Sequence, residues 1–391
     1  MEVFSPDKYW PLGSTIQKEL TDLSDNNHYR HFGLISANPL TGHTVIIYRN
    51  GEKHVGSGDY GSICIRHSTD GGTTWGNEDE IYSESANSRD IRFGGGGYAS
   101  NERLFVFFST YNPDISPAPT PPDSYWVAMK YLYSDDDADT WTLGDDDLDH
   151  EIYPETNTIF NPYGHIIDVG NNTLYQTWFG GIPVQDSLSI YRMYLYKSTD
   201  GGSSFTEVIP TNDTRQPWGE PSMVNLGGGC CLILARMNDD INHFRQFKSE
   251  DNCANWHDQG ATSFESGAGS VGAPPFLSFI NYEGVGIVAC YYTMRNTNPR
   301  LLKVVFGLAK DLLENGTSGW NNNTRVEIYN YPDGITMSGY QSFFLPKNQY
   351  KGIGITFKET ASNSIAYPVI IFTKITGTGT SMHDVLTTLG L

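Results

Sequence analysis

The chain of 391 residues carries 45 acidic and 25 basic side chains, a formal net charge of −20 at pH 7. This charge argues against nucleic acid and anionic membrane surfaces as main partners, because both repel an acidic protein. An anionic ligand would need a local cluster of cations. The 41 glycines and 24 tyrosines indicate a turn-rich, all-β protein.

The five cysteines show no spacing typical of a metal site or of a disulfide framework, and we expect them to be reduced. The N-terminal residues lack a basic segment followed by an apolar run, so no secretory leader is predicted. No apolar run approaches the ~18 residues of a membrane span. The residues therefore imply no metal, no organic cofactor and no membrane partner, and they leave the location of the protein open.

The first part of the chain, residues 1–27, is polar and irregular, with one short helix expected at residues 14–23. Two strand-like runs between Phe32 and Tyr48 flank Pro39-Leu-Thr-Gly42, a composition typical of a hairpin turn. The next strand-like run leads into Ser68-Thr-Asp-Gly-Gly-Thr-Thr-Trp75. This octet returns three more times along the chain.

The later copies of the octet keep the order of its key residues. They are Ser134-Asp-Asp-Asp-Ala-Asp-Thr-Trp141, Ser198-Thr-Asp-Gly-Gly-Ser-Ser-Phe205 and Ser249-Glu-Asp-Asn-Cys-Ala-Asn-Trp256. Starts at residues 68, 134, 198 and 249 are typical of a repeat architecture. The aspartate at the third position can accept hydrogen bonds from backbone amides, and glycine at the fifth permits a positive φ. Each octet is therefore predicted to be a hairpin turn within a four-stranded sheet.

After the fourth octet the repeat continues in weaker form. Three strand-like runs between residues 276 and 307 precede Ala309-Lys-Asp311 and Trp320, which we interpret as a fifth copy with an insertion. Three more runs between residues 341 and 374 form a sixth group. We therefore predict six groups, although five or seven would also fit the spacing.

The octets resemble the Asp-box, or BNR, repeat of the sialidase superfamily, Ser-x-Asp-x-Gly-x-Thr-Trp. The first copy matches every fixed position, whereas the second has Ala138 in place of glycine. The resemblance implies a six-bladed β-propeller, with residues 1–376 as one domain closed by an N-terminal strand and residues 377–391 as a linker and short tail. Closure leaves a propeller with only short sheet edges. Because the box is a structural turn, it indicates the fold more than an activity.

A candidate site lies in the segment from Trp218 to Arg236. Glu220 begins one predicted strand and Arg236 ends its antiparallel neighbour, so both are expected at the same end of a sheet. This segment is similar to a sialidase stretch that holds a carboxylate base. The stretch from Ser338 to Glu359 resembles the one that supplies the family's nucleophilic tyrosine, which would be Tyr340. Since tyrosine has a pKa near 10, it needs a base such as Glu220 close by.

Sialidases hold the carboxylate of the substrate with three arginines, because a planar guanidinium binds a carboxylate through two hydrogen bonds. The resemblance implies Arg236, Arg295 and Arg30 for these roles, with Arg300 as the competitor of Arg295. Where the family has Arg-Ile-Pro, this chain has Arg30-His-Phe. The family's general acid precedes the first box, and its candidate here is Asp59.

A second set of residues competes with this one. Arg49 and His54, in Tyr48-Arg-Asn-Gly-Glu-Lys-His54, resemble motifs of less characterised Asp-box relatives, as does the Arg89-Asp90 pair. Together with His165 they could form a cationic pocket for a uronate, in which a histidine would carry a proton.

The leading hypothesis is a sialidase-like glycoside hydrolase that removes a terminal acidic sugar, sialic acid or a similar one, from a glycan. One alternative is a polysaccharide lyase that uses His54, the nearby arginines and Tyr340. The other is a non-catalytic carbohydrate-binding propeller, such as a phage tail component or a surface adhesin. Each of the three hypotheses implies a glycan or an acidic polysaccharide as the partner. The protein could also form an oligomer through its C-terminal tail.

Overall fold

The computed structural model is almost entirely β. It describes residues 16–19, 28–52, 60–84, 89–112, 126–145, 148, 159–182, 190–208, 218–237, 243–264, 273–282, 285–295, 297–331, 335–344, 351–360 and 366–374. One short α-helix, α2 (Ala309–Asn315), is followed by the 3-10 helix η4 (Gly316–Gly319). Among the described residues, no helix has the length and apolarity needed to cross a membrane.

The strands form consecutive groups in which each strand pairs antiparallel with the next. The first three groups are β2 (Tyr29–Ala37), β3 (Thr44–Gly51), β4 (Ser62–Ser68) and β5 (Asp79–Tyr82); β6 (Asp90–Tyr98), β7 (Leu104–Tyr111), β8 (Trp126–Ser134) and β9 (Thr142–Asp145); and β10 (Ile159–Gly170), β11 (Thr173–Ile182), β12 (Ile190–Ser198) and β13 (Thr206–Val208).

The later groups repeat this pattern. They are β14 (Trp218–Gly227), β15 (Cys230–Met237), β16 (Phe244–Ser249) and β17 (His257–Ala261); β18 (Phe276–Tyr282), β19 (Val285–Met294), β20 (Leu301–Leu308) and β21 (Trp320–Asn330); and β22 (Ile335–Phe344), β23 (Lys351–Thr360) and β24 (Ala366–Lys374). The fourth strand of the last group is β1 (Ile16–Glu19), which pairs antiparallel with β24. The helix expected at residues 14–23 is therefore wrong where the chain is described, because this segment completes the edge of a sheet.

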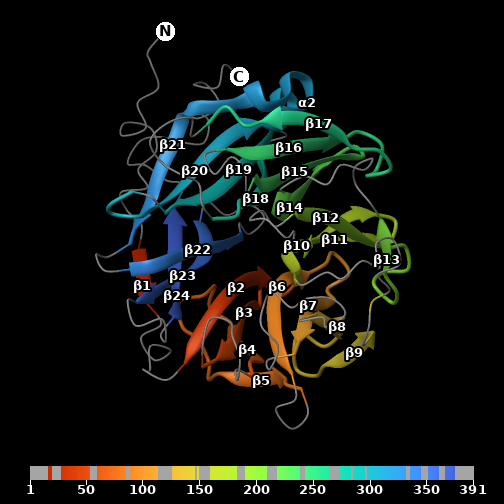
Figure 1. Cartoon of the computed structure of the whole chain (residues 1–391), viewed down its shortest axis with the longest axis vertical. Coiled ribbons are helices and arrows are strands. Elements are labelled where there is room, and N and C mark those ends of the chain that lie inside the picture. The colour runs from red at the N-terminus through yellow and green to blue at the C-terminus, as the bar shows by residue number, and fades with distance from the viewer. Residues whose placement is uncertain are drawn as a thin grey trace.

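The first strands of the groups lie side by side around a common centre (Figure 1). Contacts run from β2 to β6, β10, β14, β18 and β22, and then from β22 back to β2. At one of these contacts the neighbouring strands pair in parallel, where Gly164 of β10 faces Gly95 of β6. The curled β-structure therefore closes on itself, and residues far apart in sequence meet at its centre.

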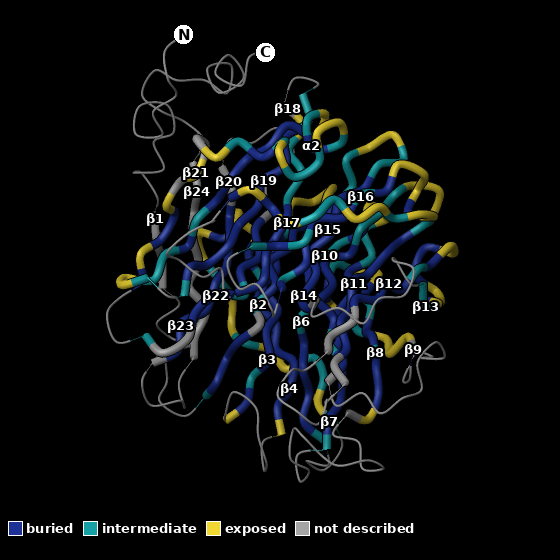
Figure 2. The backbone as a smooth tube through the Cα atoms, turned by 45° about the horizontal axis from the view of Figure 1, so that its top comes forward, coloured by how far each residue is buried: buried dark blue, intermediate teal, exposed yellow. Residues whose placement is uncertain are grey.

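Apolar side chains fill the space between neighbouring groups. One cluster joins Leu34 and Ile47 of the first group to Phe93 and Val106 of the second, and comparable clusters separate the other groups. In Figure 2 the buried residues lie along the strands, and most exposed residues lie in turns at the periphery. Burying one such side chain stabilises the fold by roughly 1.5–3 kcal/mol. The packing thus fixes the inner strands on which any central site must be built.

The four octets connect the third and fourth strands of the first four groups, as predicted. In every copy the serine hydroxyl donates to the aspartate, at 2.7 to 2.9 Å. The amide of the fifth residue donates to the serine hydroxyl, and the amide of the seventh donates to the aspartate. The fifth residue has a positive φ even where it is Ala138 (72°) or Cys253 (66°). At the corresponding place in the fifth group, α2 and η4 form the insertion that the sequence suggested.

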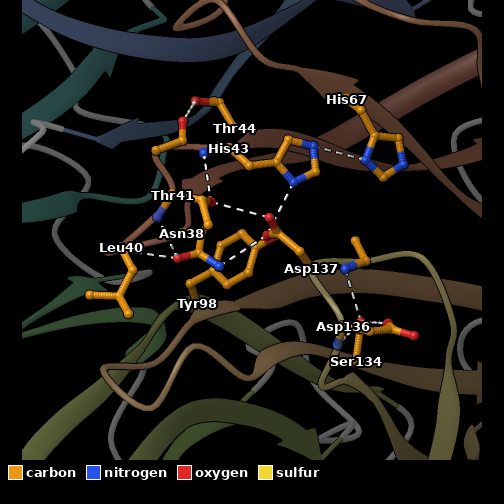
Figure 3. A network of polar contacts seen from close by, with 12 residues as sticks. Asn38, Leu40, Thr41, His43, Thr44, His67, Tyr98, Ser134, Asp136 and Asp137 are labelled. Carbon is orange, nitrogen blue, oxygen red and sulfur yellow. Dashed lines mark hydrogen bonds and ion pairs between the residues drawn. The ribbon is translucent and has the colours of Figure 1, made fainter.

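The second octet also joins two groups through its fourth residue, Asp137 (Figure 3). This carboxylate accepts hydrogen bonds from the Asn38 side chain at 3.0 Å and from Tyr98 at 2.7 Å. It also lies 3.1 Å from Nδ1 of His43, whose ring stacks on His67. The second octet is therefore a contact between sheets as well as a turn within one.

Candidate active site

Tyr340 and Glu220 meet at the centre of the fold from two inner strands. Both residues lie at interruptions of strand register, between Gly219 and Ser222 on β14 and between Gly339 and Ser342 on β22. Both have a left-handed backbone, with φ of 48° at Glu220 and 50° at Tyr340. A positive φ is costly for non-glycine residues, and such strain is concentrated at functional sites. The strands are thus bent where these two side chains project.

The two side chains are directly hydrogen-bonded. The Tyr340 hydroxyl donates to Oε1 of Glu220 at 2.5 Å. The other carboxylate oxygen accepts from Nη1 of Arg236 at 2.7 Å. Arg236 can reach it because its backbone lies opposite Gly219 in the β14–β15 ladder. The carboxylate therefore connects a phenol to a guanidinium.

Arg295 completes the cluster at the end of β19. Its Nε donates to the carbonyl of Ser338 at 2.7 Å, which fixes the side chain beside β22. Its guanidinium carbon lies 5.4 Å from the centre of the Tyr340 ring, a cation–π contact. Tyr340, Glu220, Arg236 and Arg295 are therefore brought together, as the sequence predicts.

The electrostatics keep Tyr340 protonated at rest. Desolvation by burial raises the pKa of the Tyr340 phenol, and the negative charge of Glu220 raises it further. Arg295 and Arg236 act in the opposite direction. A neutral phenol that donates to a carboxylate can act as a nucleophile only if its proton moves to that carboxylate.

A second phenol–carboxylate pair lies next to the first. Tyr29 of β2 donates to Oε2 of Glu359 on β23 at 2.6 Å, and both side chains are buried. Tyr29 and Tyr340 pack against Phe357 in one cluster. Sequence reasoning did not single out Tyr29, because a tyrosine next to Arg30 carries no signal of its own.

The remaining candidate arginines have other partners. Nε of Arg30 forms an ion pair with Glu78 at 2.9 Å, and Tyr48 donates to the same carboxylate. Arg49 is fully buried and pairs with Asp90 at 2.6 Å. The structure therefore places Arg30 in an ion pair within the first group, and Arg49 in an ion pair that joins the first group to β6 of the second.

Two further candidates, Asp59 and His54, lie outside the described residues. Desolvation lowers the pKa of Arg300, and the positive charge of Arg295 lowers it further.

His165 contacts the backbone carbonyl of Ile35 at 2.8 Å and the Ser342 hydroxyl at 3.1 Å through Nε2. Desolvation lowers its pKa to about 4. The ring is thus neutral at pH 7 and joins three inner strands.

Comparison with solved structures identifies the fold. The chain is similar to a protein of unknown function from Dyadobacter fermentans, with 15% identity, a TM-score of 0.68 and coverage of 93% of this chain and 99% of that one. It is also similar to Trypanosoma rangeli sialidase in complex with sialic acid, with 14% identity, a TM-score of 0.66 and coverage of 96% and 61%. The Hadza microbial sialidase Hz136 gives 13% identity, a TM-score of 0.67 and coverage of 92% and 67%.

These similarities show that the chain has a sialidase-like fold. It spans about three fifths of the trypanosomal sialidase, which is the longer protein. No family model and no curated protein matches the sequence. The comparisons therefore show the fold, and an activity is inferred from the cluster around Tyr340.

Proposed function

We propose that the protein is a glycoside hydrolase of the sialidase type, built as a six-bladed β-propeller. The closed ring of contacts among the six inner strands supports the blade number. The hydrogen bond of 2.5 Å from Tyr340 to Glu220 carries the functional part of the proposal. A tyrosine paired with a carboxylate is the nucleophile arrangement that distinguishes sialidases from most glycosidases.

The substrate in this proposal is a glycan with a terminal acidic sugar, sialic acid or a similar one. Arg236 and Arg295 would bind its carboxylate, since both lie at the Tyr340–Glu220 pair. Arg30 remains the proposed third arginine on its sequence position, and its Nε forms an ion pair with Glu78. Asp59 remains the proposed general acid on its sequence position.

The reaction would proceed in two displacements. Oη of Tyr340 attacks the anomeric carbon while its proton passes to Oε1 of Glu220, and the leaving oxygen takes a proton from the acid. Water then attacks the same carbon and gives a proton to the conjugate base of that acid. The phenol leaves and recovers its proton from Glu220. Retention of anomeric configuration follows from the two inversions.

Release of 4-methylumbelliferone from its α-sialoside tests this proposal. Tyr340→Phe removes only the attacking oxygen, and we expect kcat to fall by at least about a thousandfold. Tyr98→Phe is the matched control, because its hydroxyl bonds Asp137 between two groups and contacts none of the four site residues. Its turnover should equal that of the wild type.

Two outcomes would reject the proposal. Undiminished turnover by Tyr340→Phe would show that another group attacks. A wild type that binds sialic acid in calorimetry but releases no product would be a binding protein instead. If the wild type neither cleaves the sialoside nor binds sialic acid, uronate polysaccharides can be tested by the ultraviolet absorbance of an unsaturated product, which a lyase forms and a hydrolase does not.

A further inference from the structure

Tyr163 lies beside the Tyr340–Glu220 pair but belongs to another inner strand, β10. Its ring meets that of Tyr340 edge to face, with centroids 6.3 Å apart. Its backbone is held firmly, because the Tyr163 carbonyl accepts hydrogen bonds from the side-chain amide of Gln176 at 3.0 Å and from the Thr177 hydroxyl. The next residue, Gly164, takes a φ of 79°, which glycine adopts without strain. The backbone is thus fixed at the point where the phenol projects from the strand.

The hydroxyl of Tyr163 differs from those of its neighbours. Tyr340 and Tyr29 each donate to a glutamate. The side chain of Tyr163 is only 5% exposed, yet its oxygen is buried with no hydrogen-bond partner in the described part of the chain. Buried polar atoms nearly always have a partner, and an unmet one destabilises the fold. Such an atom at a strained site requires an explanation.

The surroundings make this hydroxyl a permanent donor. Burial raises the pKa of the Tyr163 phenol, and the charge of Glu220 adds to the effect. Tyr163 and Tyr340 also line one small cavity, together with Gly33, Gly94 and Ser342 of the neighbouring inner strands. The centre of a water molecule could move within about 10 Å³ of this cavity. The cavity therefore has room for roughly one polar group of the size of water.

We propose that Tyr163 is a substrate-contact residue whose hydroxyl donates a hydrogen bond to an oxygen of the sugar bound at Tyr340. This inference rests on the proposed function and adds a further residue to its site. A neutral donor suits a hydroxyl or ether oxygen of the sugar, whereas the two arginines suit its carboxylate. Tyr163 would therefore select a polyhydroxylated ring over a simple carboxylic acid.

Tyr163→Phe tests this role by separating activity from stability. Removing an oxygen that has no hydrogen-bond partner among the described residues should leave the thermal unfolding midpoint unchanged or higher. The same change should lower kcat/KM on the 4-methylumbelliferyl α-sialoside about tenfold or more, the effect of one lost hydrogen bond.

Tyr175→Phe is the reciprocal control. The hydroxyl of this buried tyrosine donates to the carbonyl of Asn252 at 3.2 Å, within the fourth octet. Its loss should lower the unfolding midpoint and leave kcat/KM unchanged. The two variants are thus expected to behave in opposite ways.

Any other result for these variants contradicts either the role of Tyr163 or the proposed hydrolase function on which that role rests. If Tyr163→Phe keeps the wild-type kcat/KM while Tyr340→Phe is inactive, the inference fails and the proposed function stands. If Tyr163→Phe lowers the midpoint together with kcat/KM, its role is structural and the inference also fails.

If the wild type cleaves nothing, calorimetric binding of sialic acid decides. Binding that weakens tenfold in Tyr163→Phe supports the donor role without the hydrolase, whereas equal binding by the two proteins rejects the donor. Absence of binding by the wild type rejects both proposals.

Discussion

Two arginine–carboxylate pairs near the centre of the fold have the same chemistry and different surroundings. Arg49 and Asp90 are 0% and 1% exposed, whereas Arg236 and Glu220 are 24% and 8% exposed. The oxygen of Asp90 that faces Arg49 also accepts the amides of Gly61 and Ile91. Glu220 instead has Tyr340 as its other partner.

The difference separates a structural pair from a reactive one. A buried carboxylate bound by two backbone amides and a guanidinium is fixed in its position. A partly exposed carboxylate that accepts from a phenol can exchange a proton with it. A Cβ at Gly51 or Gly61 would lie 2.3 or 2.5 Å from the Arg49 guanidinium, so both glycines are needed to enclose it. Residue type alone thus does not reveal which pair takes part in chemistry.

The largest effect is expected at the buried pair. Asp90→Asn keeps an oxygen for the two amides but removes the charge opposite Arg49, and we expect the free energy of unfolding to fall by about 3–5 kcal/mol. Urea unfolding measures this loss. The kcat of the folded fraction should be unchanged. A stable variant with impaired kcat would instead assign Arg49 and Asp90 to the site.

An intermediate effect of the opposite kind is expected at Glu220. Glu220→Gln keeps the shape of the side chain but cannot take the proton of Tyr340, so kcat should fall by about a hundredfold or more. Because the ion pair with Arg236 is partly exposed, the free energy of unfolding should change by no more than about 1 kcal/mol. A large loss of stability with normal kcat would make the two pairs equivalent and remove the distinction.

The last and most gradual effect is a pH dependence of stability that comes from two buried or half-buried histidines. The pKa of His165 is lowered from 6.5 to about 4 by desolvation, and that of His67 is lowered by desolvation and by His43. The unfolded chain therefore binds more protons in this range, so stability should fall as the pH drops from about 6.5 to 4. Urea midpoints measured at several pH values show the slope, and His165→Gln should reduce it. An unchanged slope in this variant would exclude His165 as a cause.

The repeated turns could be predicted because their chemistry is local. Ser68, Asp70 and Gly72 make their hydrogen bonds within one octet, so their order in the sequence is sufficient. The Tyr340–Glu220 pair depends on strands 120 residues apart, and a resemblance was needed to propose it. The folded chain confirms that the two side chains meet, while their roles remain proposals.

Other features of the centre could not be predicted because they depend on side-chain direction and on missing contacts. Successive residues of a strand face opposite sides, so Tyr29 contacts Glu359 while Arg30 contacts Glu78. A sequence does not say which of the two neighbours faces the site. The hydroxyl of Tyr163 is distinguished by its lack of a hydrogen-bond partner among the described residues, which no sequence pattern encodes.

The pairing of β1 with β24 has a mechanical consequence. Ile16 lies opposite Phe372 and Glu19 opposite Val369, so the outer ends of the two strands are neighbours. A pulling force applied to both ends of the chain would break these strand pairs one after another, beginning at Ile16 and Phe372, instead of breaking all of them at once. The first part to yield would be this edge, with β23 and β24 between it and Tyr340 on β22. A molecule stretched between two attachments would therefore lose its outermost strand before its central cluster is disturbed.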